Sequence, residues 1–292
     1  MADPAPAPAP APAAPVQRAR RPLWVLRAPI PAGTARLLAV SSVALVLLVW
    51  CVLSYVTVDK GAGRPEPLIS HFFLPPPHEV LRGLLYLLFD QGLLSAVGTS
   101  VVRILKAFGL SVAVALPLGI FMGSFEAANK FFDSILAPMR YLPITAFIPL
   151  LILWFGIEEE QKVAFLFLGT FVFLLPVVVD AIKVVPEELV QTAFTLGATK
   201  AQAIRTVLIP AALPQIFDSF RVMNAIAWTY IILAEIVNPQ NGIGYILRLA
   251  EQHTKPAWSF AGILVVGIIG LLTDLLIRGL NRLLFSWREA DV

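Results

Sequence analysis

Residues able to do acid–base, metal or covalent chemistry are few in this sequence, which has three histidines and one cysteine in 292 residues. His78-Glu79 begins like a zinc-protease motif, but Arg82 occupies the place of the second histidine that this motif needs. His71 and His253 lie far apart in the sequence. We therefore expect no catalytic or metal-binding histidine cluster, and we expect the three histidines at the surface.

The sequence also gives no sign of nucleotide binding, disulfide chemistry or nucleic-acid binding. The sequence lacks a G-x-x-x-x-G-K-[ST] segment, so it has no Walker A loop with which to hold ATP and its Mg²⁺. The single cysteine, Cys51, cannot form an internal disulfide and lies inside an apolar run. A net charge of +3 is too small and too dispersed to indicate a nucleic-acid partner. We expect no bound cofactor and no enzymatic activity on this chain.

Three ionisable residues lie close to long apolar segments. Arg103 and Lys106 would attract an anionic solute near an entrance, or they would reach toward lipid headgroups or pair with acids, and we favour the second interpretation. Glu235 would bind a solute or a proton, or it would face water at the end of a helix, which is the commoner case. The sequence alone leaves both alternatives open.

The composition is that of an integral membrane protein. Hydrophobic residues make up 58% of the chain, charged residues 14%, and the mean hydropathy is +0.80, whereas soluble domains average about 25% charged residues. Uncharged segments long enough to cross roughly 30 Å of hydrocarbon predict an all-α fold with six transmembrane helices. The first, with 22 uncharged residues, is longer than the roughly 7–15 apolar residues of a signal peptide. The spans are predicted at Leu37–Val58, Ser95–Phe125, Tyr141–Ile157, Val163–Val179, Arg221–Val237 and Trp258–Thr273.

The segments outside the spans suggest an organisation with both termini in the cytoplasm, which places 14 of the 22 lysines and arginines on the cytoplasmic side. Glu126–Arg140 is expected to be a short polar turn. We divide the chain into a disordered, basic, Pro/Ala-rich cytoplasmic tail (1–35), a first transmembrane helix (36–58), an extracytoplasmic segment with an amphipathic helix (59–91), a core with a cytoplasmic loop at 184–214 (92–285) and a cytoplasmic tail (286–292).

The loop at 184–214 has strong helix-boundary signals. Pro186 suits a first helical turn, and Gly197 is placed to end a helix in the left-handed conformation. Thr199 with Gln202 three residues later predicts a capping box that starts a second helix. The pattern predicts a helix-turn-helix between membrane spans. On this pattern alone, a passive connector or a DNA-binding unit would fit as well.

This loop resembles the cytoplasmic signature loop of ABC importer permeases, E-A-A-x3-G-x9-I-x-L-P. Gly197 matches the glycine, and Val207-Leu208-Ile209-Pro210 closes the motif after nine residues, while Gln191-Thr192-Ala193 replaces its usual start. Further stretches are similar to the nitrate, sulfonate, taurine and bicarbonate branch of binding-protein-dependent permeases. They are Leu74–Val80, Pro138–Pro143 with Pro149 and Trp154–Gly156, Ala234–Glu235 with Gly242–Tyr245, and Gly267–Asp274.

The resemblance implies a type I ABC importer permease fold in a bacterial inner membrane, carrying a small anionic solute such as nitrate, taurine, another sulfonate or bicarbonate. It implies four kinds of partner: the lipid membrane, a second permease copy, two ATP-binding subunits that carry ATP and Mg²⁺, and an extracytoplasmic solute-binding protein. The loop would be the coupling helix that docks on the ATPase. Its docking residues would be Glu187, Glu188, Gln191, Ala193, Phe194, Leu196, Gly197, Ala198 and Thr199.

Polar and aromatic residues within the spans are the candidates for the pathway, because such side chains are costly in a bilayer unless they face protein or water. We select Thr145, Asn224, Trp228 and Thr229, with hydrogen bonding between helices as an equal alternative. A proton- or ion-coupled secondary transporter is the alternative function. It would need ionisable residues near midspan, whereas the predicted spans carry their acids at the ends.

Overall fold

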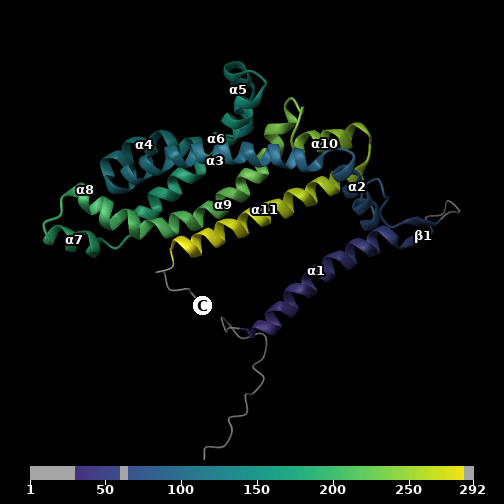
Figure 1. The fold of residues 1–292 in the computed structure, drawn as a ribbon, viewed down its shortest axis with the longest axis horizontal. Coiled ribbons are helices and arrows are strands. Elements are labelled where there is room, and N and C mark those ends of the chain that lie inside the picture. The colour runs from purple at the N-terminus through teal and green to yellow at the C-terminus, as the bar shows by residue number, and fades with distance from the viewer. Residues whose placement is uncertain (1–29, 60–64, 286–292) are drawn as a thin grey trace, which may run out of the picture. The chain divides into compact units, whose positions relative to one another are not determined.

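The computed structural model describes residues 30–59 and 65–285. The chain divides into two compact units, residues 1–52 and 53–292. Most of the predicted N-terminal tail and the whole of the predicted C-terminal tail lie outside the described residues. Helix α1 (Ala32–Tyr55) begins in the first unit and ends in the second. Figure 1 labels this helix and the elements of the second unit.

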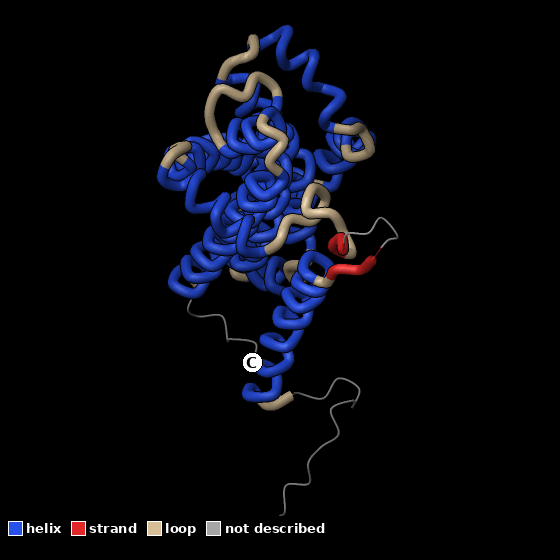
Figure 2. Tube along the Cα trace, turned by 90° about the vertical axis from the view of Figure 1, so that its right-hand side faces the viewer, coloured by secondary structure: helices blue, strands red, loops and turns tan. Residues whose placement is uncertain are grey.

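Helices make up nearly all of the second unit (Figure 2). In its described part the strands are β1 (Thr57–Asp59) and β2 (Pro65–Pro67), which pair antiparallel with Thr57 opposite Pro67. Its helices are α2 (Pro77–Phe89), α3 (Leu93–Ser124), α4 (Glu126–Met139), η1 (Ile144–Phe147), α5 (Ile148–Phe155), α6 (Glu159–Lys183), α7 (Glu187–Thr195), α8 (Lys200–Ala203), the π-helical η2 (Ile204–Leu208), α9 (Ile209–Ile236), α10 (Ile243–Gln252) and α11 (Pro256–Leu284).

Five helices of the described chain are long and apolar enough to cross a membrane, and a sixth span results if α4 and α5 act together. The five are α1, α3, α6, the continuous helix Lys200–Ile236, and α11. Six spans therefore remain a plausible count. Within the second unit, α7 and α8 lie at one end of the bundle, and α2 and α10 lie at the other (Figure 1). We call these the α7 end and the α10 end.

The third predicted span is wrong in its details. The segment Glu126–Arg140, predicted as a turn, forms the 14-residue helix α4, because its charged residues recur at helical spacing and occupy only part of the helix surface. The segment Tyr141–Ile157 contains only η1 and the eight-residue α5, which rises about 12 Å and cannot cross the hydrocarbon alone. Pro143 precedes η1 at the break, and α4 and α5 meet there at 88°. A third span in this region would therefore be a bent pair of helices.

Two further boundaries differ from prediction. The fifth span was predicted from Arg221, but its helix is continuous from Lys200, since Pro210 falls in the first turn of α9 and a π-helical turn precedes it. The segment Gly242–Ile246 lies between the predicted fifth and sixth spans, but it forms the N-cap and first turn of α10. Gly242 has a φ of +91° at the N-cap, a conformation that favours glycine.

The core lies between α3, α6 and α9. Gly119 and Gly123 bring α3 close to α6: a Cβ at Gly119 would lie 2.6 Å from Val178 Cγ1, and one at Gly123 would lie 2.7 Å from Ile182 Cβ. These two glycines, four residues apart, therefore form a close-packing face on α3. Further along the same contact, the buried hydroxyls of Ser111 and Thr170 are 2.5 Å apart. This polar contact fixes the register of α3 on α6.

Candidate functional site

The α7–α8 turn has the capping geometry that the sequence predicts. Gly197 has a φ of +84°, its N–H donates to Phe194 O at 2.9 Å, and Ala198 N–H donates to Ala193 O at 3.0 Å. This pair of bonds is a Schellman motif, which ends α7. The capping box is also present, because Thr199 N–H donates to Gln202 Oε1 at 2.8 Å and Gln202 N–H to Thr199 Oγ1 at 3.4 Å. The turn between the two helices is therefore defined by backbone hydrogen bonds together with two side-chain capping bonds.

Helix α7 presents its side chains outward at the α7 end of the bundle. None of its nine residues, all of them described, is buried. Leu189 is 48% exposed, Phe194 46%, and Leu196, which follows the helix, 83%. Gln191, at the departure from the signature motif, donates its side-chain N–H to Glu187 Oε1 at 3.1 Å. Exposed apolar side chains on and next to a firmly capped helix suit a surface that docks on another protein.

Three of the four pathway candidates line one groove between α9 and α11. The groove has a volume of about 550 Å³ and includes Asn224, Trp228 and Thr229 in its lining. Thr145 lies instead on η1, where its side chain is exposed. Asn224 Nδ2 donates to Thr273 Oγ1 at 2.9 Å, and Trp228 Nε1 donates to the same oxygen at 3.1 Å. These two residues therefore line the groove and also hold α9 to α11.

A bidentate ion pair that the sequence analysis did not find lies at the side of the same groove. Arg221 Nε donates to Asp274 Oδ1 at 2.7 Å, and Arg221 Nη2 donates to Asp274 Oδ2 at 3.1 Å. Arg221 lies at the predicted start of the fifth span, and Asp274 directly follows the predicted end of the sixth. Their pairing depends on how α9 and α11 align, which sequence spacing does not provide.

The most buried charges of the described chain cluster toward the α10 end. Glu235 is fully buried and Arg103 is 1% exposed. Glu235 Oε1 accepts hydrogen bonds from Arg103 Nη1 at 2.7 Å and from Ser100 Oγ at 2.6 Å, while Glu235 Oε2 accepts one from Gly244 N–H at 2.7 Å. The carboxylate thus has three donors from α3 and α10.

Arg103 makes further contacts that connect α3, α6 and the α9–α10 connection. Its Nε donates to Glu159 Oε2 at 2.7 Å, its Nη1 to Asn241 O at 3.3 Å, and its Nη2 contacts both Glu159 Oε1 and Asn241 Oδ1. Arg103 therefore pairs with acids, the interpretation that the sequence favoured. Lys106 is exposed and lines an open pocket beside it. Glu235 is the partner of Arg103 and does not face water.

Two glycines allow the chain to approach this buried ion pair. A Cβ at Gly242 would lie 2.5 Å from the Glu235 carboxyl carbon and 2.6 Å from Arg103 Nη1, and one at Gly244 would lie 2.3 Å from Glu235 Cβ. The Gly-x-Gly spacing of these two residues has its structural role in this close approach. It was the one sequence signal that could have pointed to the cluster.

Comparison with known proteins identifies the family. A model described as the binding-protein-dependent transport system inner membrane component matches residues 115–286. The chain belongs to this family. The taurine transport system permease protein of Escherichia coli strain K12 is 31% identical over 255 residues, covering 86% of this chain and 89% of that protein. A putative aliphatic sulfonates transport permease protein of Bacillus subtilis strain 168 is 30% identical over 247 residues, covering 85% of this chain and 86% of that protein.

A more distant relative agrees with this assignment, and two solved structures have the same fold. The bicarbonate transport system permease protein of Synechococcus elongatus is 26% identical and covers 81% of this permease and 84% of the relative. A methionine ABC transporter in an inward-facing conformation superposes with a TM-score of 0.53 at 19% identity, covering 64% of this chain and 95% of that one. A bacterial alginate ABC importer superposes with a TM-score of 0.54 at 16% identity, covering 87% of this chain and 98% of that one. The permease has the fold of type I ABC importers.

Proposed function

We propose that this permease forms the pathway by which a small anionic solute enters a bacterial cell, driven by ATP hydrolysis on separate subunits. The solute class rests on relatives named for taurine, aliphatic sulfonates and bicarbonate. Nitrate, expected from the sequence resemblance, belongs to the same class of small oxyanions. The permease would lie in the inner membrane with the α7 end and both termini in the cytoplasm.

The observation that carries the proposal is the exposed, capped α7 segment. ATP hydrolysis on another subunit must reach the spans through a mechanical contact, because this chain has no Walker A loop. Helix α7 offers exposed Leu189, Phe194 and Leu196 to such a contact. The four residues Leu196–Thr199 connect α7 to the continuous helix Lys200–Ile236, so a displaced α7 would move α9 directly. ATP and Mg²⁺ would be bound by the two partner ATPases alone.

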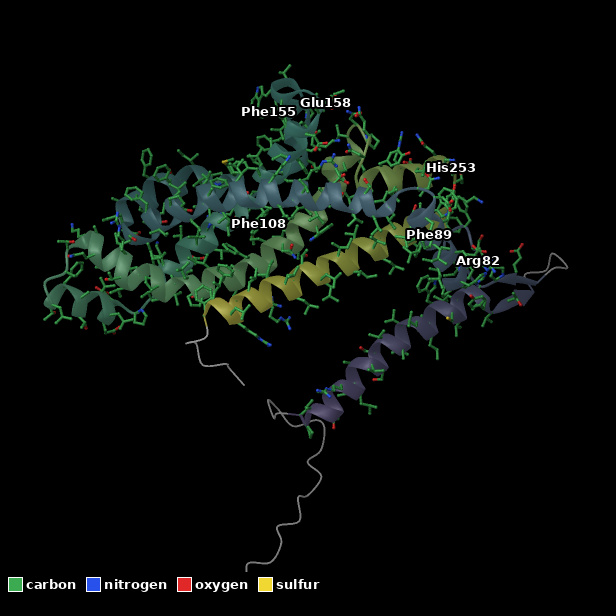
Figure 3. All side chains as sticks on the ribbon, viewed as in Figure 1. Arg82, Phe89, Phe108, Phe155, Glu158 and His253 are labelled. Carbon is green, nitrogen blue, oxygen red and sulfur yellow. The ribbon has the colours of Figure 1, made fainter. Side chains whose placement is uncertain are left out.

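The remaining partners would be a second permease copy and an extracytoplasmic solute-binding protein at the α10 end. Helix α5 supports the second copy. It projects from the bundle, with Phe155 and Glu158 near its tip (Figure 3). Leu153 is 78% exposed and Trp154 63%. Irregular backbone such as the α4–α5 break is tolerated at membrane depth only where protein or water covers it. A second copy packed on α5 would supply that cover.

The test is transport by the complete complex in proteoliposomes. The permease, its ATPase and its solute-binding protein would be reconstituted with ATP inside the vesicles, and uptake of labelled taurine, ethanesulfonate and bicarbonate would be measured. We expect uptake of at least one of these three solutes, and we expect it to require both ATP and the binding protein. Uptake that follows an imposed proton or sodium gradient without ATP would instead establish a secondary transporter.

A further inference from the structure

A second polar cavity lies apart from the groove between α9 and α11. It has a volume of about 230 Å³ and is enclosed mainly by α4 and α6, with Met122 of α3 at its wall. Neither the family assignment nor the sequence analysis gives it a role. Its polar lining residues are Asn129, Asp133 and Arg140 from α4, and Asp180 and Lys183 from α6.

Helix α4 has two different faces. Asn129, Asp133 and Arg140 follow at intervals of four and seven residues, which places them on the face that lines the cavity. Phe131 and Ile135 point elsewhere and are 66% and 59% exposed. The apolar face suits lipid or a second permease copy. The charged face is turned toward α6.

These charges extend well into the membrane if α4 is part of the third span. Helix α4 lies beside the last part of α3 (Figure 1), and Glu126 at its start pairs with Lys183 at the end of α6, 3.3 Å away. From Glu126, Asp133 lies about 10 Å and Arg140 about 21 Å further along the helix axis. Charged side chains at such depth face protein or water, because lipid contact is costly. We infer that the cavity is part of the aqueous pathway.

Arg140 has the chemistry to bind an oxyanion there. Its Nη2 donates to Asp133 Oδ1 at 2.9 Å, which fixes the guanidinium while using one of its five N–H donors. The side chains of Arg140 and Asp133 are 36% and 49% exposed. A guanidinium presents a planar fork that matches the oxygens of a sulfonate or carboxylate. A solute that also carries an ammonium group would find the carboxylates of Asp133 and Asp180 in the same cavity.

We propose that this cavity is a transient binding site for small sulfonates and carboxylates in the α7-side half of the pathway. Arg140 contacts the anionic group, and Asp133 positions Arg140. This inference rests on the proposed transport function, because it places the transported solute in the cavity. The substrates it favours are those whose anionic end has at least two oxygens in one plane with the guanidinium.

Thiol labelling tests the cavity without requiring transport. Asn129→Cys would be placed in a Cys51→Ala permease within the complete complex. Its reaction rates with anionic 2-sulfonatoethyl and cationic trimethylammonioethyl methanethiosulfonate would then be compared. We expect both reagents to react and the anionic-to-cationic rate ratio to fall several-fold on adding Arg140→Gln, since a unit positive charge is removed from the cavity that the thiol also lines. Lys130→Gln is the matched control, 80% exposed on the same helix and outside the cavity lining.

The proposal would be overturned if the anionic-to-cationic rate ratio fell equally in the Lys130→Gln control. It would also be overturned if Asn129→Cys reacted with neither reagent. A charge swap adds a second criterion. Asp133→Arg combined with Arg140→Asp keeps an ion pair on α4, so a purely structural role predicts normal taurine uptake, whereas solute binding predicts loss of uptake in an assembled complex. If the swapped permease does not assemble, the labelling ratio decides. If wild-type complexes import none of the three test anions, the proposed solute class is wrong. The labelling experiment does not require transport, so its result would still test the cavity.

Discussion

Removing the guanidinium of Arg103 is predicted to destabilise the permease strongly. Arg103→Met would leave Glu235, which is fully buried, without its ion-pair partner, while Ser100 and Gly244 would remain as hydrogen-bond donors. Breaking a buried ion pair by removing one partner costs about 3–5 kcal/mol. With about 2–4 °C per kcal/mol for a domain of this size, the apparent Tm in detergent should fall by about 10 °C.

The paired substitution separates an unpaired charge from a general packing defect. Arg103→Met with Glu235→Leu removes both buried charges, and replacing a buried pair by apolar residues of similar volume is often close to neutral. Glu159 tolerates the loss because its side chain is 47% exposed. We expect the double variant to recover most of the lost Tm. The surface control Lys130→Met, whose ion pair with Glu126 is largely exposed, should change the Tm by a degree or two at most.

The measurement is thermal unfolding of the purified permease followed by fluorescence-detected size exclusion. An unchanged Tm for Arg103→Met would refute the reasoning, because it would mean that Glu235 is solvated or protonated at no cost. A double variant as unstable as the single one would show that the pair acts through shape and not through charge.

Three further predictions follow from close contacts and from the groove. Gly242→Ala should lower the Tm and the yield, because its Cβ would overlap the Glu235 carboxyl group at 2.5 Å in a backbone with a φ of +91°; a stable Gly242→Ala permease would argue against this packing. Gly119→Val should disrupt the α3–α6 contact, whereas Gly109→Val on the same helix, with open space around the added Cβ, should be tolerated, as expression and Tm would report. Cysteines at Thr145, Asn224, Trp228 and Thr229 in a Cys51→Ala background should react with a water-soluble thiol reagent in one transport state, and a site that reacts in neither state is not in the pathway.

The sequence was sufficient for local features and insufficient for those that depend on the alignment of helices. The α7–α8 turn was predictable because its signals, Gly197, Thr199 and Gln202, act through backbone bonds to neighbours within five residues. Helix α4 was missed because its charges were read as a turn, although their spacing is helical. The Arg103–Glu235 pair joins residues 132 apart in sequence, so no local pattern encodes it. The sequence shows Gly242 and Gly244, which allow this pair to form, but it does not show which residues they approach.

The central claim is that the α7 segment docks the ATPase, and co-purification of the ATPase with permease variants tests it most directly. Leu196→Glu changes a side chain that is 83% exposed and touches little of the permease, so the spans should insert normally. Gly197→Val adds a side chain in open space but strains a φ of +84° by about 1 kcal/mol or more. Gly92→Val is its matched control, with a φ of +65° and equally open surroundings between α2 and α3.

We expect Leu196→Glu and Gly197→Val, and the bulky Ala193→Trp, to lose the ATPase on purification and to lose solute-stimulated ATP hydrolysis, while expression and membrane insertion are retained. Gly92→Val should keep its ATPase. If all three α7 variants retain the ATPase and hydrolyse ATP in response to solute like the wild type, α7 is a passive connector and the coupling assignment is wrong.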